Sequence, residues 1–441
     1  MPEAQLETPT TAEILEEKIR TRAARVGVVG LGYVGLPLAV EFAKAGFAVT
    51  GIDISQEKAR RVNAGDSYVG DVPSATLGPL VESGKLRATA DFSAVLELDT
   101  INICVPTPLR KTKDPDMSYI VSACQEIARH FHAGMLIILE STTYPGTTDE
   151  LVLPMLSKSG LEVGRDFFLC FSPERVDPGN PKFQTANIPK VVGGSTPACT
   201  GMGRLFYSQA LERVVPVSST QVAEMVKLLE NTFRMINIGL VNEMALMCDR
   251  MGIDVWEVID AAATKPFGFM PFYPGPGLGG HCIPIDPFYL SWKTRQAGIE
   301  ARFIELAGYI NGQMPHFVAD TVQNALNDAG QPVKGSHIHV MGVAYKRDID
   351  DMRESPALDV MLLLKRRGAV LTYSDPHVPA IRVDGLEIES APEESAAAAD
   401  CVVIVTDHSA FDYQALVDRA RLVVDTRNAL KGFSSDRIVR L

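Results

Sequence analysis

Apolar runs of a strand's length alternate with helical patterns along most of this chain of 441 residues. In the amino-terminal half the expected strands lie at 25–30, 47–53, 100–105, 135–140 and 167–171. A polar helix is expected over 10–24, and an amphipathic helix follows the first strand. Continuous apolar runs are typical of parallel strands that are buried on both faces by covering helices. The pattern therefore predicts a doubly wound α/β domain.

A long helix is expected in the middle of the chain. Apolar side chains recur there at steps of three and four residues, at Val222, Met225, Val226, Leu229, Phe233, Ile236, Leu240 and Met244. This spacing predicts one amphipathic helix over 220–250, and its methionine-rich stripe suits a spine between two domains or a dimer surface. A second helical segment is expected over 296–327.

The α/β alternation restarts after the segment 330–335, which begins and ends with glycine. The strands expected there lie at 337–343, 369–374, 401–406 and 421–425, with a helix over 355–367. The fold class is therefore α/β, with two doubly wound Rossmann-like domains joined by a long central helix and a helical middle domain. We place the domain boundaries at 1–215, 216–330 and 331–441.

Charge and cysteine usage narrow the possible partners. The formal net charge of −12 argues against nucleic acid, because phosphate binding requires a basic surface. No apolar run reaches the roughly 18 residues of a membrane helix, and residues 1–25 lack a signal peptide's hydrophobic segment. We therefore expect a cytoplasmic protein without membrane insertion. The seven cysteines stand singly, which predicts reduced thiols and no metal site.

A dinucleotide fingerprint follows the first expected strand. Gly30, Gly32 and Gly35 form a GxGxxG pattern between a strand and a helix, where glycines allow a tight turn and close approach of a pyrophosphate. Asp53 ends the next strand, where its carboxylate would bond both ribose hydroxyls and repel a 2′-phosphate. The pattern favours NAD over NADP, and the alternative is a tight turn that binds no cofactor. Further cofactor contacts are expected at Tyr33, Val34 and Lys58.

Polar residues follow other expected strands, at the sheet edge where α/β proteins bind ligands. Thr107 and Thr142 are expected to contact cofactor or substrate, although either threonine could instead satisfy the backbone of its own turn. Glu174 is a candidate base, and the alternative is a surface ion pair with Arg175.

The stretch 274–289 sets one cysteine among glycines and prolines. Glycine tolerates backbone angles that other residues avoid, and proline stiffens the loop, so the stretch is expected to present Cys282 in a rigid, exposed cradle. Asp286 follows one short turn later, close enough to serve as a base near the thiol. The alternative is that Cys282 is a small buried side chain in an ordinary turn.

Two more pairs of residues indicate a functional site only when they are considered together with the other motifs. Lys227 and Asn231 stand four residues apart on the expected long helix and share one face, which alone would indicate solvated surface. Lys346 and Arg353 bracket an acidic segment after a strand, which suits a diphosphate. Taken alone, that segment is better interpreted as a charged surface loop.

Taken together, these motifs resemble the UDP-glucose/GDP-mannose dehydrogenase family. The matching segments, in the family's order, are 30–37, 105–108, 172–174, 227–231, 279–286 and 346–356. Six ordered motifs over nearly the whole chain leave little room for chance agreement. The resemblance implies a homodimer, or a higher homo-oligomer, built on the central helix. It also implies a four-electron oxidation of a sugar 6-hydroxyl to a carboxylate with two NAD⁺.

The resemblance also implies roles for individual residues. The implied catalytic set is Cys282, Lys227, Asp286, Asn231, Glu174 and Thr142. Cys282 would hold the C6 aldehyde as a thiohemiacetal, whose oxidation gives a thioester that water hydrolyses. Lys227 and Asn231 would stabilise the sugar oxyanion, Asp286 and a water would take the protons, and Glu174 with Thr142 would position water or substrate. Besides Glu174, Lys227 and Asn231, the implied substrate contacts are Arg175, Tyr273, Gly279, Lys346 and Arg427, and Arg353 would reach the NAD pyrophosphate.

Within the family, 172–180 and 267–277 resemble enzymes that oxidise UDP-N-acetylglucosamine for bacterial surface polysaccharides. Pro266 stands where glucose-type enzymes place an arginine, which would make room for a 2-acetamido group. UDP-N-acetyl-D-glucosamine is therefore the expected substrate, and UDP-N-acetylmannosamine, UDP-N-acetylgalactosamine and UDP-glucose stay open. Two remoter alternatives are a two-electron β-hydroxyacid dehydrogenase, in which Cys282 is structural, and an NAD-binding regulator without catalysis.

Overall fold

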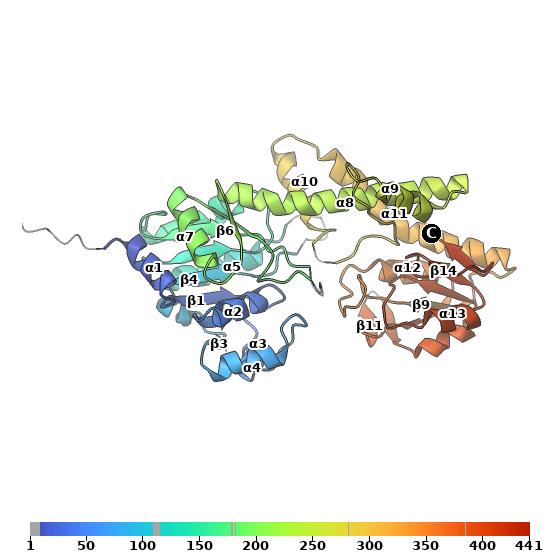
Figure 1. Ribbon diagram of the computed structural model, residues 1–441, viewed down its shortest axis with the longest axis horizontal. Helices are drawn as coiled ribbons and strands as arrows, with labels where there is room; N and C mark the ends of the chain where they lie inside the picture. Colours follow the sequence, from blue (N-terminus) through green and yellow to red (C-terminus); the bar gives the residue numbers. More distant parts are fainter. Residues whose placement is uncertain (1–8, 109–114, 178–179, 181, 281, 384) are drawn as a thin grey trace, which may run out of the picture. The chain divides into compact units, whose positions relative to one another are not determined.

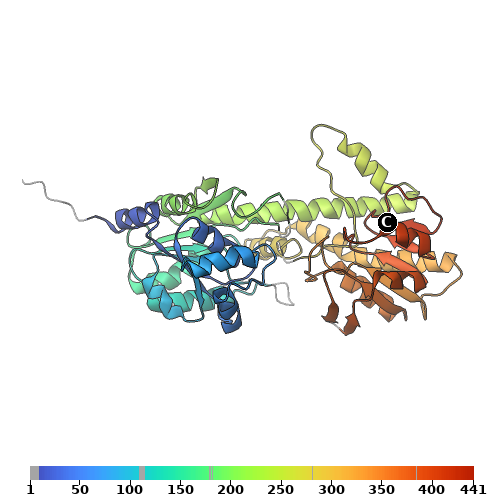
Figure 2. The same ribbon diagram turned by 60° about the horizontal axis from the view of Figure 1, so that its bottom comes forward.

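The chain divides into two structural units, Met1–Glu230 and Asn231–Leu441 (Figure 1). The computed structural model describes residues 9–108, 115–177, 180, 182–280, 282–383 and 385–441. The parts of the sequence motifs that fall on 178–179 and 281 lie outside the described residues. Helix α8, Thr220–Met251, carries the chain from one unit into the other and is unbroken in both views (Figures 1 and 2).

The first unit is built on one twisted sheet. Its strands are β1 Arg25–Val29, β2 Ala48–Ile52, β3 Leu86–Thr89, β4 Thr100–Ile103, β5 Leu136–Leu139, β6 Phe168–Phe171, β7 Lys190–Gly194 and β8 Val214–Val217. The order is β3-β2-β1-β4-β5-β6-β7-β8, and the first six strands are parallel. This is the order of a dinucleotide-binding Rossmann sheet. β7 departs from it, because it runs antiparallel to β6.

Helices bury both faces of this sheet. They are α1 Thr11–Arg20, α2 Gly35–Lys44, α3 Gln56–Asn63, α4 Ser74–Glu82, α5 Ser118–His130, α6 Leu153–Leu156 and α7 Pro197–Tyr207. Alternate residues of β5 enter different cores: Leu136 and Ile138 pack with α1, α2 and α7, whereas Ile137 and Leu139 pack with α5 and α6. An apolar run without alternation is therefore what a strand covered on both sides requires.

Helices continue through the middle of the chain, where the structure corrects one expected element. They are α9 Val255–Ala263, α10 Asp286–Gln296 and α11 Arg302–Asp328. The helix expected over 296–327 begins later, because Gly298 has a φ of +76° and separates α10 from α11. α10 was not expected, and it starts directly from the cysteine loop. None of the helices in the described ranges combines the length and apolar character of a membrane span.

The second unit contains a parallel five-stranded sheet. Its strands are β9 His337–Met341, β10 Val370–Ser374, β13 Cys401–Ile404, β14 Val423–Asp425 and β15 Ile438–Arg440, beside the antiparallel hairpin β11 Ala380–Val383 and β12 Leu386–Glu389. The order β10-β9-β13-β14-β15 is the other common doubly wound order. α11 and α12, Pro356–Arg366, cover one face, and α13, Tyr413–Arg419, covers the other. The expected fold class, with two Rossmann-like domains and a helical middle, is confirmed.

Candidate active site

The glycine-rich loop between β1 and α2 has the shape that a pyrophosphate needs. Gly30 has a φ of +91°, and a Cβ there would lie 2.6 Å from the carbonyl oxygen of Cys104. A Cβ on Gly35 would lie 1.9 Å from the carbonyl oxygen of Gly30, so both positions exclude side chains. A Cβ on Gly32 would meet nothing within 4 Å, which leaves its backbone open to a ligand. Each glycine therefore meets a different requirement of a dinucleotide-binding loop: Gly30 allows the tight turn, Gly32 leaves the backbone open to the ligand, and Gly35 allows close packing.

Asp53 stands at the end of β2, as the fingerprint predicts. Its carboxylate accepts hydrogen bonds from the N–H groups of Leu31 and Ser55, both at 2.9 Å, and Lys58 Nζ lies 3.2 Å from Oδ2. Asp53 therefore braces the glycine-rich loop in addition to any contact with a ribose. Lys58, expected as a cofactor contact, belongs to this group. Tyr33 is about half exposed, and Thr107 is buried.

A buried ionic network occupies the carboxyl edge of the same sheet. Lys190 Nζ lies 2.6 Å from Glu140 Oε2 and 3.1 Å from Glu174 Oε2. Glu140 Oε1 also accepts hydrogen bonds from Asn102 Nδ2 and the Tyr207 hydroxyl, both at 2.6 Å. The sequence reasoning identified Glu174 but missed Lys190 and Glu140. The available signal was a lysine at the start of the apolar run 190–194.

Glu174 is not the partner of the Arg175 side chain, which was the alternative drawn from the sequence. Arg175 instead forms a two-pronged ion pair with Glu230, with nitrogen–oxygen distances of 2.6 and 3.2 Å. Glu174 Oε1 accepts the backbone N–H groups of Arg175 and Val176. Burial raises the pKa of the Glu174 carboxyl, but the Lys190 charge and these hydrogen bonds outweigh burial and leave the pKa below its usual value.

Lys227 is buried on α8 and does not form the solvated surface that its spacing alone indicated. Its Nζ lies 2.6 Å from Thr142 Oγ1, so two expected catalytic residues meet. One turn earlier, Glu224 accepts the N–H groups of Gly146 and Thr148. The start of α8 is therefore tied to the loop that follows β5.

In the second unit, the cysteine loop leads directly into α10. The carbonyl oxygen of Cys282 accepts the N–H groups of Ile285 and Asp286, at 3.1 and 2.8 Å. This turn sets the half-buried Cys282 one turn before Asp286. The Asp286 carboxylate is buried, and its Oδ2 accepts a hydrogen bond from Asn231 Nδ2 at 2.5 Å. The short turn expected between thiol and carboxylate is present.

The glycines of the cysteine loop are needed for close packing. A Cβ on Gly279 would lie 2.6 Å from Tyr345 Cβ, and Gly280 has a φ of +86°. The N–H of Gly280 donates to the carbonyl oxygen of Arg353 at 3.1 Å. The loop therefore lies against the segment that begins at Lys346, which is half-buried, while the Arg353 guanidinium pairs with Asp351 at 2.7 Å.

The loops after β9 and β14 are strained. Among the described residues other than glycine, positive φ occurs at Arg22, Asp348, Glu354 and Asn428. Three of these four, Asp348, Glu354 and Asn428, lie in the two segments that carry the expected substrate contacts Lys346 and Arg427. Strain of this kind persists where the surroundings impose it, often at ligand sites. Arg427, beside Asn428, donates from Nε to the carbonyl oxygen of Val405 at 2.9 Å.

Tyr273, an expected substrate contact, is about half exposed. Its hydroxyl donates to Asp260 Oδ1 at 3.0 Å, and Lys431 Nζ lies 2.6 Å from the other carboxylate oxygen. The ring stacks on Trp256, with 6.0 Å between centroids. The ring orientation of Tyr273 is thus set within its own unit.

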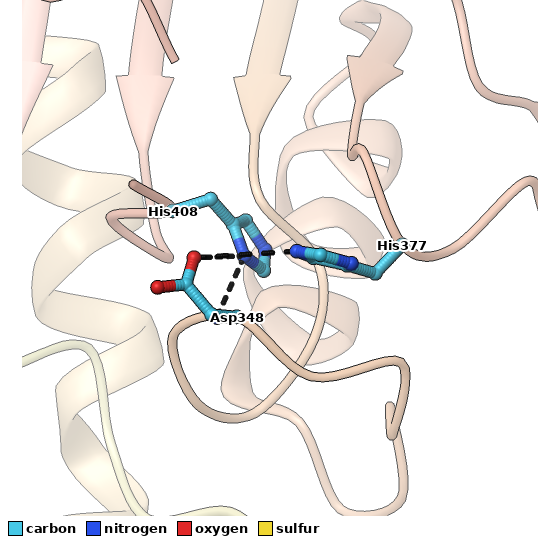
Figure 3. A group of neighbouring side chains, drawn as sticks. All are labelled: Asp348, His377 and His408. Atoms are coloured by element: carbon cyan, nitrogen blue, oxygen red, sulfur yellow. Dashed lines mark hydrogen bonds and ion pairs between the residues drawn. The ribbon is translucent and has the colours of Figure 1, made fainter. Parts of the chain in front are cut away.

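Asp348 also belongs to a cluster with His377 and His408, whose side chains turn toward one another (Figure 3). The N–H of Asp348 can only donate, so His408 Nδ1 accepts it, at 3.0 Å. His408 Nε2 then carries the proton and donates to Asp375 Oδ2, also at 3.0 Å. This arrangement commits the Nδ1 lone pair, which a metal would need, and clamps the loop that carries Lys346. The expectation of a metal-free site remains a prediction.

Comparison with known proteins covers nearly the whole chain. Three models of the UDP-glucose/GDP-mannose dehydrogenase family match: the NAD binding domain at 24–211, the central domain at 221–313 and the UDP binding domain at 339–432. UDP-N-acetyl-D-mannosamine dehydrogenase of Salmonella typhi is 36% identical over 423 residues, 91% of this chain and 98% of that protein. UDP-N-acetyl-D-glucosamine 6-dehydrogenase of Pseudomonas aeruginosa is 36% identical over 392 residues, 88% and 91% of the two chains.

Solved structures agree in fold. The UDP-D-ManNAc dehydrogenase of Pyrococcus horikoshii has a TM-score of 0.86 and 33% identity, and the match covers 94% of this chain and 98% of the other. An NDP-N-acetyl-D-galactosaminuronic acid dehydrogenase of Methanosarcina mazei Go1 has a TM-score of 0.81 and 30% identity, with 98% of both chains covered.

Proposed function

The chain belongs to the UDP-glucose/GDP-mannose dehydrogenase family, and from that premise we propose that it oxidises C6 of UDP-N-acetyl-D-glucosamine to the carboxylate. Membership makes it an NAD-dependent nucleotide-sugar 6-dehydrogenase of the UDP-N-acetylhexosamine type. The proposal adds the epimer, the residue roles and a cytoplasmic place in surface polysaccharide synthesis. One observation carries the roles: a half-buried thiol stands one turn before a buried carboxylate that Asn231 already holds.

In this proposal, Cys282 allows two successive oxidations at one carbon because it holds the intermediate between them. When bound at the glycine-rich loop and Asp53, NAD⁺ would supply the acceptor for the hydride that leaves C6 in each oxidation. After the first oxidation, the Cys282 thiolate adds to the C6 aldehyde, forms a carbon–sulfur bond and prevents the aldehyde from escaping. The second oxidation leaves a thioester on the sulfur. Water then adds to the thioester carbonyl and the carbon–sulfur bond breaks, which releases the carboxylate and returns the thiol.

The other residues hold charge and protons. We assign Asp286 the protons released around the thiol, because its carboxylate is oriented by Asn231. Lys227, oriented by Thr142, supplies a buried positive charge for the developing sugar oxyanion. Lys346 and Arg427 supply the positive charges that bind the diphosphate of the substrate in the second unit. Such local cations are needed because the chain as a whole carries a net negative charge.

The yield of NADH tests the proposal. Purified protein with NAD⁺ and limiting UDP-N-acetyl-D-glucosamine should give two NADH and one uronic acid per sugar. A yield of one NADH per sugar would support the two-electron alternative, and no NADH with any UDP-sugar would support the non-catalytic one. UDP-N-acetyl-D-mannosamine is the second candidate, because relatives named for it are as similar as the glucosamine enzyme. The epimer with the higher kcat/KM decides between them.

We also infer a homodimer built on α8. Phe233, Leu240 and Met247 repeat every seven residues along this helix and are 47%, 54% and 43% exposed in a single chain. A stripe at this spacing on one helix is typical of a surface that packs against a second helix. Light scattering should give twice the mass of the chain, and Leu240→Glu should shift the mass toward the monomer. A monomeric wild type would contradict the inference.

A further inference from the structure

Lys190 sits between two carboxylates at the carboxyl edge of the first sheet, and none of the motifs contains it. Its Nζ bonds Glu140 at 2.6 Å and Glu174 at 3.1 Å. The Lys190 side chain is 6% exposed, Glu140 is fully buried, and Glu174 is 10% exposed. Two negative charges therefore share one buried positive charge. Such a group costs free energy unless each member is paired and hydrogen-bonded.

The antiparallel strand β7 is what brings Lys190 to this edge. Cys170 pairs with Gly194 and Phe171 with Gly193, so each step forward on β6 is a step back on β7. Continued by three residues, this register places Glu174 opposite Lys190. A parallel β7 would have delivered its first residue to the opposite edge of the sheet. The single reversal in the sheet thus supplies a cation to the end where ligands bind.

The two carboxylates differ in what they can still accept. Glu140 receives Lys190, Asn102 and Tyr207 and is enclosed by protein. Glu174 receives two backbone N–H groups on Oε1 and Lys190 on Oε2. A carboxylate oxygen has two lone-pair sites, so Oε2 retains one for a donor from outside. All donors to Glu174 favour its ionised form.

We propose that Lys190, anchored by Glu140, is the positioning residue for Glu174 and keeps this carboxylate an oriented acceptor for the water or sugar hydroxyl of the reaction. The inference rests on the proposed function. Lys190 touches neither substrate nor cofactor in this scheme. It acts through Glu174, which accepts a hydrogen bond from the reacting group and stays ionised.

Other charged and titratable groups face the trio from the neighbouring elements. They are Tyr207 on α7, Cys104 after β4 and the Arg175 guanidinium, which is bound to Glu230. Burial, and then Glu140, raise the pKa of the Cys104 thiol and that of the Tyr207 hydroxyl, so neither supplies charge near neutrality. Burial opposes the charge on Lys190, but Glu140 and Glu174 raise its pKa above the ordinary value. Lys190 is thus the cation that decides the ionisation of Glu174.

The test compares two variants with side chains of similar length. Lys190→Met removes the positive charge, and Lys190→Arg keeps it. In Lys190→Met the acid limb of the kcat profile should move up by about one pH unit or more, because an opposite charge within hydrogen-bond distance lowers a carboxyl pKa by about that much. Activity lost near neutrality should return at higher pH, and KM for the UDP-sugar should change by less than about threefold. Lys190→Arg should keep the wild-type limb. An equal loss of kcat at every pH in both variants would show a purely structural role and overturn the proposal.

Two further measurements keep the proposal testable if Lys190→Met does not fold or the substrate is wrong. Glu140→Gln removes the rival carboxylate, so the limb should move to lower pH, and a shift to higher pH would contradict the scheme. Isotope-edited infrared titration of Glu174 in the resting protein needs no substrate. Glu174 should titrate below its ordinary pKa in wild type and above it in Lys190→Met. Identical titrations would overturn the positioning role even if wild type makes no NADH, whereas distinct titrations without NADH would reject only the proposed function.

Discussion

Asn242→Ala should destabilise the second unit and loosen the cysteine loop. Asn242 lies on α8 with no exposed surface, and it joins three segments. Its Nδ2 donates to Asn311 Oδ1 on α11 at 2.8 Å, and its Oδ1 accepts the N–H of Gly275 at 3.0 Å. Asn311 in turn donates to the carbonyl oxygen of Met235. One amide therefore links two helices and the loop that leads to Cys282.

The magnitude follows from what the substitution leaves behind. Alanine removes both hydrogen bonds, and the N–H of Gly275 and the Oδ1 of Asn311 become buried groups without a partner. Each of these two groups costs about 1–3 kcal/mol, so we expect a loss of about 2–6 kcal/mol. That is a large part of the roughly 5–15 kcal/mol that stabilises a typical protein. The loop should also lose its anchor, and kcat should fall more than affinity for NAD.

The assay is urea unfolding followed by a probe in the second unit, together with steady-state NADH formation. Asn324→Ala is the matched control, since Asn324 is an exposed asparagine on α11 in the same unit. Surface changes of this kind usually stay within about 0.5 kcal/mol. If Asn242→Ala were as stable and active as the control, the three-way link would not hold the loop.

Three other changes test separate parts of the molecule. Cys282→Ala should abolish acid formation and Cys282→Ser should leave a slow ester adduct visible by mass spectrometry, whereas normal turnover of the alanine variant would remove the nucleophile. Asp53→Ala should weaken NAD binding by about ten- to a hundredfold, or about 1.4–2.8 kcal/mol. The substitution removes the acceptor for the ribose hydroxyls and leaves the N–H of Leu31 without its hydrogen bond to Asp53. Unchanged NAD affinity in a fluorescence titration would refute this prediction. Burial lowers the pKa of His339 from 6.5 to about 4, so the folded state binds this proton less readily. Stability should fall as pH drops from 6.5 toward 4, by up to about 3 kcal/mol, and His339→Gln should flatten that part of the urea midpoint profile.

Local signals in the sequence were enough for the fold class and for the residues that lie in turns. The run 25–30, the glycines after it and Asp53 predict a strand, a phosphate-binding turn and a ribose acceptor, because each is set by neighbours within one βαβ unit. The glycines and prolines around Cys282 likewise predict a loop at that position. What the pattern missed near it was α10, since 286–296 has proline as its second residue, follows a loop-like composition and shows no clear apolar stripe.

The ion pairs of the site depend on strand pairing, and this was outside the reach of local patterns. Glu140, Glu174 and Lys190 are spread over 50 residues and meet only because β7 reverses beside β6. From the sequence, the adjacent Arg175 was the obvious partner for Glu174. In the folded chain Arg175 forms an ion pair with Glu230 on α8, and Lys190, from the next strand, is the ionic partner of Glu174.

Residues that do chemistry and residues that hold them are marked in the sequence in opposite ways. Of the expected catalytic residues, Thr142, Glu174 and Cys282 stand in loops, where a polar side chain costs little and several functions can explain it, whereas Lys227 and Asn231 stand on α8. Asn242, Glu224 and Lys190 stand in or beside buried elements, where an unpaired amide or charge costs several kcal/mol. Such a residue persists only if a partner elsewhere in the chain needs it, as the loops after β5, after β6 and before Cys282 do here. A single polar residue in an apolar element is therefore evidence for a distant partner, and the partner's identity is the part that only the folded chain can supply.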